Sequence, residues 1–258
     1  EMTVDFIFYH IEKCGGSSLR LSLYDYFSKI YSRDEIFIPA KTNMNFVRKH
    51  LPTICDKRDC SKLKILLSHM SDGFPYRHLQ IPTQIKFTCV RNPVDRVISH
   101  YYFFDYPHTK IDLIDLEAST FRRYCKTMGK LQCDRMGCLN SKGFTTVTKI
   151  TKYIQSFYFI CVVENLSEDL KQLNRMLNTT YSCSHEIKEH TTNVGKSQIK
   201  NYAMLKEKIS KIPMYDTLLY KEVLSHRKIQ DGRECSEIIS TIGSVDGTHP
   251  LFINSKST

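Results

Sequence analysis

The sequence lacks several features that would assign it to a membrane or metal-binding class. It has no run of about 20 apolar residues, so no membrane-spanning helix is predicted in this segment. The cysteines and histidines show neither a C-x-x-C motif nor zinc-ligand spacing, so no metal is expected. Internal repeats and low-complexity tracts are absent as well. Because 41% of the 258 residues are hydrophobic, we expect one ordered domain with a sizeable core.

Charge and cysteine content indicate the kind of partner and compartment. The formal net charge of +10 favours nucleic acid, acidic lipid or acidic glycan as a partner, although an ordinary lysine-rich surface would give the same value. The ten cysteines include two close pairs that local disulfides could close, Cys55 with Cys60 and Cys133 with Cys138. An even count with two close pairs favours an oxidising compartment.

A strand–loop–helix junction near the N-terminus carries the main functional signal. Apolar residues over 4–9 predict a buried strand, and apolar residues at helical spacing from 19 to 30 predict a helix. The loop between them contains Lys13, Cys14, Gly15, Gly16, Ser17 and Ser18. Two glycines allow a tight bend and a close approach to a ligand, and the free N–H groups at a helix start bind anions, phosphate above all.

This loop differs from the nucleotide-triphosphatase loop G-x-x-x-x-G-K-[ST], because its lysine precedes its glycines. A strand-to-helix turn can also carry two glycines beside a lysine by chance. The loop alone therefore favours phosphate binding without establishing it.

Runs that predict strands alternate with helical patterns along the chain, at residues 4–9, 62–68, 85–90 and 158–163. This alternation predicts an α/β fold with a parallel sheet covered by helices on both faces. Residues 32–61 are expected to form loops and a short helix, residues 105–150 show no strong period, and a last helix is predicted over 212–226.

Polar residues follow three of the predicted strands. Lys13, His69 and Arg91 each come after the last apolar residue of a strand. Ligands of parallel sheets bind at the carboxyl ends of the strands, so we expect these three side chains on one rim. Arg91 and Ser99 could bind a second phosphate; alternatively, Arg91 pairs with Asp95 and Ser99 has no role.

These segments resemble the eukaryotic Golgi carbohydrate sulfotransferases, in particular the uronyl and heparan sulfate 2-O-sulfotransferase group and its relatives. The similar stretches are the lysine-glycine-serine loop, the segment Ser68-His69-Met70, and the segment from Arg91 to Tyr102. The resemblance covers about residues 5–104 well and continues more weakly beyond. It departs from the family pattern where Glu12 and Cys14 replace the usual proline and threonine.

The resemblance implies a P-loop-like sheet and the donor 3′-phosphoadenosine 5′-phosphosulfate, with no metal. The 5′-phosphosulfate would lie against the loop residues Lys13, Cys14, Gly15, Gly16, Ser17 and Ser18. The 3′-phosphate would contact Arg91 and Ser99, and Lys196 would close over the donor. His69 matches the histidine assigned as the base, whereas His10 and His100 lack the catalytic position and are expected to be structural. Glu12 could damp the charge of Lys13 or act as a rival base.

The sequence therefore predicts a sulfotransferase that acts on a hydroxyl of an acidic glycan in the Golgi lumen. We expect a donor-binding core over 1–104, acceptor-side elements over 105–230 and a loop-rich tail over 231–258. Basic residues could line an acceptor groove or form a solvated helix face, namely Arg122, Arg123, Lys126, Lys130 and Arg135. The sequons at Asn165 and Asn178 fit a secreted glycoprotein. Nucleic acid is not expected as a partner, and membrane attachment would need an anchor outside this segment.

Three alternatives remain open at this point. The acceptor could be a tyrosine or a small molecule instead of a glycan. The chain could be a nucleotide kinase, for which Glu164 is a faint candidate to hold magnesium. It could also be a non-catalytic module that binds heparin or nucleic acid.

Overall fold

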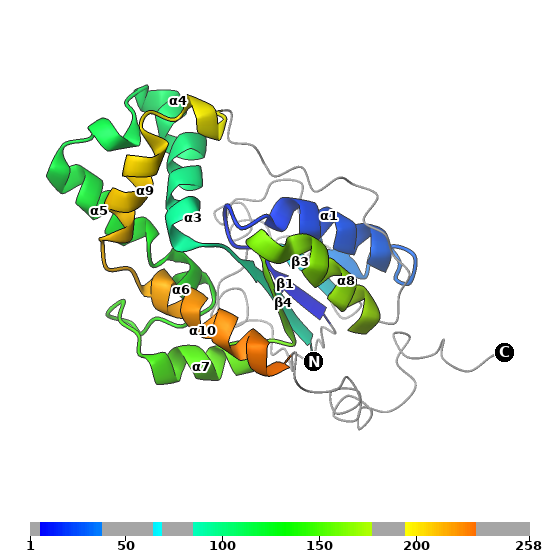
Figure 1. Cartoon of the computed structure of the whole chain (residues 1–258). Helices are drawn as coiled ribbons and strands as arrows, with labels where there is room; N and C mark the ends of the chain where they lie inside the picture. Colours follow the sequence, from blue (N-terminus) through cyan, green and yellow to red (C-terminus); the bar gives the residue numbers. More distant parts are fainter. Residues whose placement is uncertain (1–5, 38–63, 69–84, 177–193, 231–258) are drawn as a thin grey trace.

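The computed structural model describes residues 6–37, 64–68, 85–176 and 194–230 (Figure 1). Within these ranges the chain forms a parallel sheet of five strands in the order β2-β3-β1-β4-β5. The strands are β1 (Phe6–Tyr9), β2 (Ile36–Phe37), β3 (Ile65–Ser68), β4 (Ile85–Val90) and β5 (Phe159–Val162). The predicted α/β fold with a parallel sheet is therefore confirmed.

Helices cover both faces of the sheet and extend beyond its carboxyl edge (Figure 1). One face packs against α1 (Gly16–Phe27) and α8 (Leu166–Met176). The opposite face packs against α6 (Leu131–Arg135), α7 (Val147–Gln155) and α10 (Tyr215–Gln230). A helical region with its own core follows β4, and it contains α3 (Pro93–His100), α4 (Tyr106–Thr109), α5 (Ala118–Met128) and α9 (Tyr202–Ser210).

Short helical segments join these elements. The π-helical turn η2 (Tyr101–Asp105) continues α3 without a break, and three short 3₁₀ turns are η3 (Leu113–Asp115), η4 (Val163–Asn165) and η5 (Lys196–Gln198). π-helical turns inside α-helices are frequent at functional sites. Across the described helices, none combines the length and the hydrophobicity that a bilayer crossing requires.

The residues of the central strand β1 are all apolar because both faces of the strand are buried. Phe6 and Phe8 pack on the α1 and α8 side, whereas Ile7 and Tyr9 pack on the α10 side. Each of the four is at most 2% exposed. Because both faces of a parallel sheet are covered, side chains pointing either way must be apolar.

Two regions differ from the sequence prediction. Residues 32–61 were expected to contain only loops and a short helix, yet Ile36 and Phe37 form the edge strand β2 beside β3. Two residues are too few to show a strand period. Residues 105–150, which show no strong period, hold four helices. The longest of them, α5, buries Cys125 and packs Phe121, Tyr124 and Met128 beside it, an apolar stripe at helical spacing that the sequence analysis overlooked.

The prediction of a disulfide between Cys133 and Cys138 is wrong. Both are free, buried thiols, and the N–H of Cys138 closes the turn by donating to the Cys133 carbonyl at 2.8 Å. A hydrogen bond with the Cys138 thiol, together with burial, raises the pKa of Cys133. The thiolate that disulfide exchange requires is therefore disfavoured. Cys55 and Cys60 lie outside the described residues, as does the tail over 231–258.

Candidate functional site

The loop between β1 and α1 presents a helix start to a ligand. Gly15 is the N-cap of α1 and has a left-handed backbone, with φ +67°. Within the described structure no side chain caps this helix, and its first turn contains no acidic residue. The first backbone N–H groups and the positive end of the helix dipole are therefore available to an anion, as predicted for this loop.

Gly16 is required by the packing beneath the loop. A Cβ atom added at Gly16 would lie 2.0 Å from Cδ2 and 2.6 Å from Nε2 of His10. His10 is 3% exposed and stacks on Phe8 with ring centroids 6.1 Å apart, so it has little room to retreat. Glycine is thus required at the two positions for different reasons. Gly15 has a left-handed backbone, and Gly16 packs closely against His10.

Replacing Gly16 with alanine is expected to lower the free energy of unfolding by about 1–3 kcal/mol, the range for overpacked interiors. Chemical denaturation would measure this change. Gly195→Ala is the matched control, because a Cβ there would meet nothing closer than 3.6 Å and its φ is −62°. Equal stabilities for the two variants would contradict the close packing of His10 against Gly16.

Lys13 has a strained backbone and a side chain held at the edge of the loop. Its φ is +62°, which is unfavourable for a residue with a Cβ, and such strain clusters at functional sites. Its Nζ lies 3.9 Å from the ring centroid of Phe103 in η2. Burial, with a smaller contribution from Arg91, lowers the pKa of Lys13 to about 8. The ammonium is thus still protonated at neutral pH.

Arg91 contacts the Lys13 loop directly. Nη1 of Arg91 donates a hydrogen bond to the Lys13 carbonyl at 3.3 Å. The structure thus brings together these two residues, which follow adjacent strands. The alternative ion pair between Arg91 and Asp95 is not formed, because Asp95 accepts from Tyr202 at 3.1 Å and pairs with Lys206 at 2.9 Å.

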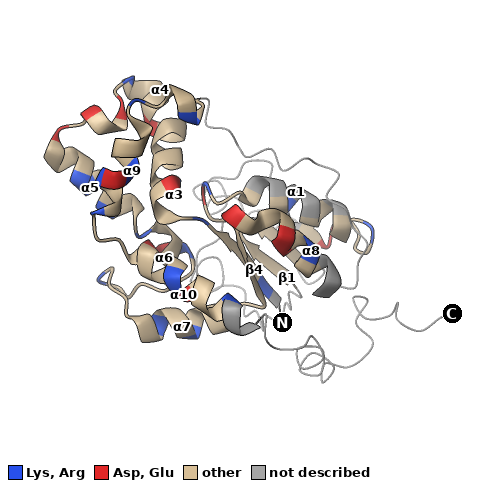
Figure 2. Cartoon of the chain, in the orientation of Figure 1, with Lys and Arg blue, Asp and Glu red and all other residues tan. Residues whose placement is uncertain are grey.

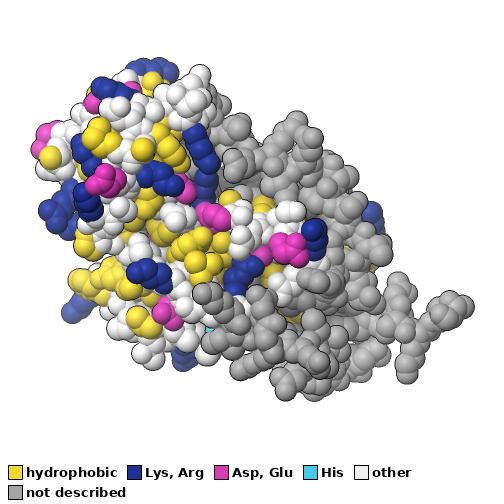
Figure 3. Space-filling model, in the orientation of Figure 1, with side chains coloured by type: hydrophobic (Ala, Val, Ile, Leu, Met, Phe, Trp, Pro, Cys, Tyr) yellow, Lys and Arg dark blue, Asp and Glu magenta, His cyan; other side chains and the backbone are white. Residues whose placement is uncertain are grey.

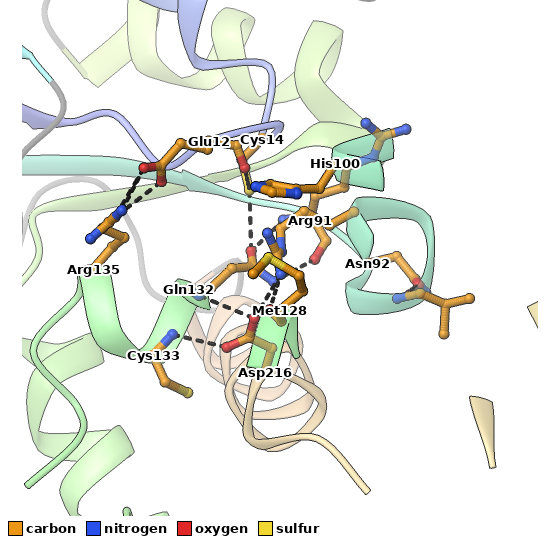
Figure 4. Close-up of polar contacts among 12 residues, drawn as sticks. Glu12, Cys14, Arg91, Asn92, His100, Met128, Gln132, Cys133, Arg135 and Asp216 are labelled. Atoms are coloured by element: carbon orange, nitrogen blue, oxygen red, sulfur yellow. Dashed lines mark hydrogen bonds and ion pairs between the residues drawn. The ribbon is translucent and has the colours of Figure 1, made fainter. Parts of the chain in front are cut away.

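A buried glutamine, which the sequence analysis did not identify, forms hydrogen bonds to both Arg91 and the loop. The N–H of Arg91 donates to Oε1 of Gln132 at 2.9 Å, and Nε2 of Gln132 donates to the Arg91 carbonyl at 3.0 Å (Figure 4). The Cys14 thiol donates to the same Oε1 at 3.4 Å. Gln132 is fully buried, so Cys14 and the backbone of Arg91 share one fixed partner.

The first turn of α6, which carries Gln132, is itself held by a buried ion pair. The Asp216 carboxylate accepts from the backbone N–H of Gln132 at 3.1 Å and of Cys133 at 2.9 Å. Arg96 Nη2 lies 3.6 Å from Asp216 and also donates to the Met128 carbonyl. Both charged side chains are fully buried, and burial raises the pKa of Asp216 although Arg96 opposes the shift.

Glu12, the residue that departs from the family pattern, is paired. Arg135 donates to both of its carboxylate oxygens, with Nη2 to Oε1 at 2.6 Å and Nε to Oε2 at 3.0 Å. Each side chain is 17% exposed. The bidentate guanidinium occupies both carboxylate oxygens, so Glu12 is a poor candidate for a rival base. Arg135 thus supports the donor loop, while Arg122, Arg123 and Lys126 are exposed on α5.

A capped helix starts directly after Arg91. Asn92 caps α3 by accepting from the N–H groups of Val94 at 3.0 Å and Asp95 at 3.4 Å, and Pro93 is the first helical residue. Ser99 lies two turns along α3 and is 5% exposed. That low exposure leaves little surface for a phosphate, so the geometry supports Arg91 more directly than Ser99.

The other predicted site residues either do not contact Lys13 and Arg91 or lie outside the residues that the structure describes. His69 lies outside the described residues, immediately after β3. Ser17 and Ser18 contribute the backbone of the first turn of α1, and their side chains are not described. Lys196 is exposed in η5, and no hydrogen bond or ion pair between described residues joins it to Lys13 or Arg91.

His100, which was expected to be structural, is buried among charged groups. Burial and then the nearby Arg96 lower the pKa of His100 to about 4, with Lys13 and Arg135 acting in the same direction and Glu12 opposing them. The imidazole is therefore neutral at pH 7 and feels the charges of the loop.

The residues considered for metal binding have other partners. Within the described ranges no group of three His, Cys, Asp or Glu side chains is arranged to hold a metal ion. Glu164, the faint magnesium candidate, accepts from the Asn92 N–H at 2.9 Å and from the Tyr220 hydroxyl at 3.0 Å. Both of its oxygens thus have protein donors.

Comparison with known proteins agrees with this geometry. A family model described as "Sulfotransferase family" matches residues 2–221. The matched span includes the loop, Arg91, Gln132, Asp216 and every site residue predicted from the sequence. The predicted sulfotransferase resemblance is therefore confirmed. No curated protein matches the chain significantly.

Proposed function

Because this chain belongs to the sulfotransferase family, we propose that it transfers a sulfuryl group from 3′-phosphoadenosine 5′-phosphosulfate to a hydroxyl of an acidic glycan. The observation that carries the proposal is the direct contact between Arg91 and the Lys13 loop at an uncapped helix start. The donor has one anionic group on each side of its ribose. Lys13 and Arg91 follow adjacent strands, so their two cations lie close enough to bind the two anionic groups of one donor molecule.

In the proposed reaction the acceptor oxygen forms a bond to sulfur while the bond from sulfur to the 5′-phosphate oxygen breaks. The electron pair of that bond stays on the phosphate, and a base takes the acceptor's proton. Lys13 and the first amides of α1 would stabilise the charge that develops on the phosphate oxygen. The resemblance assigns the base to His69. A general base contributes about 10²–10⁴-fold to such a step.

The acceptor class rests on the resemblance and on the net charge of +10. Among the described elements drawn in Figure 2, basic and acidic residues are intermixed along α5, α9 and α8. On the face shown in Figure 3, basic side chains are scattered among apolar and polar ones. The described part of this face therefore lacks the continuous basic surface that a polyanion-binding module would favour. A Golgi location and glycosylation at the exposed Asn165 belong to the same proposal.

A transfer assay tests the proposal. Protein would be incubated with donor labelled on the sulfuryl group and with three acceptor sets: desulfated acidic glycans, a tyrosine peptide and small phenols. We expect label on a glycan, with equal rates in magnesium and in EDTA. Label only on the peptide or on phenols would reassign the acceptor. No transfer to any acceptor, or phosphoryl transfer from magnesium-ATP, would overturn the proposed activity.

Calorimetry with adenosine 3′,5′-bisphosphate tests the donor site without an acceptor. Wild-type protein should bind this nucleotide more tightly than adenosine 5′-monophosphate, which lacks the 3′-phosphate. Arg91→Ala should remove most of that preference, whereas Arg123→Ala, an exposed arginine on α5, should keep it. Equal affinities for the two nucleotides in the wild type would contradict the assignment of Arg91.

A further inference from the structure

The π-helical turn η2 carries two aromatic side chains on the surface. The N–H of Tyr106 donates to the carbonyl of Tyr101, five residues earlier, which is the wider spacing of a π turn. Tyr101 and Tyr102 continue the buried side of α3 and are at most 2% exposed, whereas Phe103 and Phe104 are 40% and 44% exposed. A ring on the surface gains little from burial, so what it contacts indicates its role.

The Phe103 ring contacts the ammonium of Lys13. Nζ of Lys13 lies 3.9 Å from the ring centroid, well inside the range of about 6 Å for a cation–π interaction. The Phe104 ring packs on Phe103 with centroids 4.7 Å apart and 77° between the ring planes, which restricts how Phe103 can turn. Within the part of the chain that the structure describes, no hydrogen bond or ion pair reaches this Nζ. The aromatic face is therefore what holds the ammonium there.

The contact leaves the ammonium able to bind an anion. An ammonium has three N–H donors, and the ring covers it from one side only, so the donors that point away from the ring stay available. Lys13 is half-buried, and the loop that carries it leads into the uncapped start of α1. The ring thus holds the cation beside the helix start that the proposed function assigns to the 5′-phosphosulfate.

The titratable groups on the neighbouring elements are Arg91 after β4, Glu12 and Cys14 in the loop, His100 at the end of α3 and Asp105 in η2. Both oxygens of Glu12 accept from the guanidinium on α6, and Asp105 accepts from a tyrosine hydroxyl on α5. His100 is neutral at pH 7. Burial and then Arg91 lower the pKa of Lys13, with Cys14 acting in the opposite direction. The negative face of an aromatic ring stabilises the charged form that burial and Arg91 disfavour.

We propose that Phe103 is a positioning residue for donor binding, because its ring keeps the Lys13 ammonium charged and in place beside the start of α1. This inference deepens the proposed function and rests on it. Without the ring the lysine side chain would extend into solvent, and binding would have to order it, which lowers affinity. Phe103 itself touches no reacting atom and acts through Lys13.

Calorimetry with adenosine 3′,5′-bisphosphate between pH 7 and pH 9 tests this role. Leucine at position 103 keeps an apolar side chain without an aromatic face, whereas tyrosine keeps the face. We expect Phe103→Leu to weaken binding at pH 7 about two- to five-fold and to move the fall in affinity about half a pH unit lower. Phe103→Tyr should match wild type. Phe144→Leu is the control, at a phenylalanine between α6 and α7 that is 56% exposed, and it should also match wild type.

Proton NMR of the protein without nucleotide tests the contact separately from the proposed function. Protons above an aromatic ring are shifted upfield, so the ε-methylene signal of Lys13, assigned by its loss in Lys13→Arg, should be shifted upfield in wild type and in Phe103→Tyr. Phe103→Leu should lose that shift.

The two measurements together decide the inference. It is overturned if wild type shows no upfield shift, if Phe103→Leu binds nucleotide as wild type does at every pH, or if the leucine and tyrosine variants lose affinity equally. If the shift is present but wild type binds no adenosine 3′,5′-bisphosphate, the proposed donor site fails, and the positioning role fails with it. If binding behaves as expected and no sulfuryl group is transferred, the proposed activity fails while the role of Phe103 in nucleotide binding is supported.

Discussion

Lys13→Ala is expected to lower kcat about 10²- to 10³-fold, the loss seen when one donor to a developing negative charge is removed. Lys13 is the cation that lies within the loop itself, and its carbonyl contacts Arg91 at 3.3 Å. Its ammonium lies on the Phe103 ring at 3.9 Å, so it is held near the helix start rather than dispersed in solvent. Rates at saturating donor would measure the effect.

Lys110→Ala is the matched control for this variant. Lys110 also has a left-handed backbone, with φ +55° against +62° for Lys13, and its ammonium also faces an aromatic ring, that of Tyr106 at 5.9 Å. The two variants therefore place alanine in the same strained conformation. If both lose activity equally, backbone strain and not the charge of Lys13 explains the loss.

The charge of Lys13 also predicts how donor affinity depends on pH. Its pKa is lowered to about 8, chiefly by burial, so the ammonium is present below that pH and is lost above it. Affinity for adenosine 3′,5′-bisphosphate should therefore fall as pH rises through about 8, and Lys13→Ala should show no such fall. Calorimetry across this range would measure it.

Asp216→Ala is expected to lower the free energy of unfolding by about 3–5 kcal/mol, the range for breaking a buried ion pair from one side. The change would leave Arg96 charged and fully buried, and it would remove the acceptor for the N–H groups of Gln132 and Cys133. Since Gln132 binds the backbone of Arg91, weaker donor binding should accompany the loss of stability. Denaturant unfolding with and without nucleotide would measure both effects.

Asp115→Ala serves as the control for an ion pair in solvent. Asp115 pairs with Lys200 at 2.8 Å, but the two side chains are 43% and 53% exposed. Exposed pairs contribute about 0–1 kcal/mol, so this variant should remain close to wild type. Similar losses for Asp216→Ala and Asp115→Ala would contradict a structural role for the buried pair.

Local sequence patterns predicted the parts of the site that depend on neighbouring residues. The strand before Lys13 and the helix that follows the two glycines depend on neighbouring residues, and both form as expected. The edge strand β2 was missed because two residues show no period. The disulfide that the spacing of Cys133 and Cys138 allowed is not formed: their thiols are hydrogen-bonded to each other and remain free.

The sequence by itself determined that the chain has an α/β fold and belongs to the sulfotransferase family, with a glycine loop between its first strand and first helix, since these follow from apolar runs, glycines and motifs. Only the tertiary structure decided what surrounds that loop. Arg91 reaches Lys13 across 78 residues of sequence, Gln132 reaches Arg91 across 41, and Arg135 reaches Glu12 across 123. Such pairs form because the sheet order and the helices packed on it bring distant segments together, and no local period records that. For the same reason, the sequence does not show that His100 is buried near the charged side chains of Arg96 and Lys13.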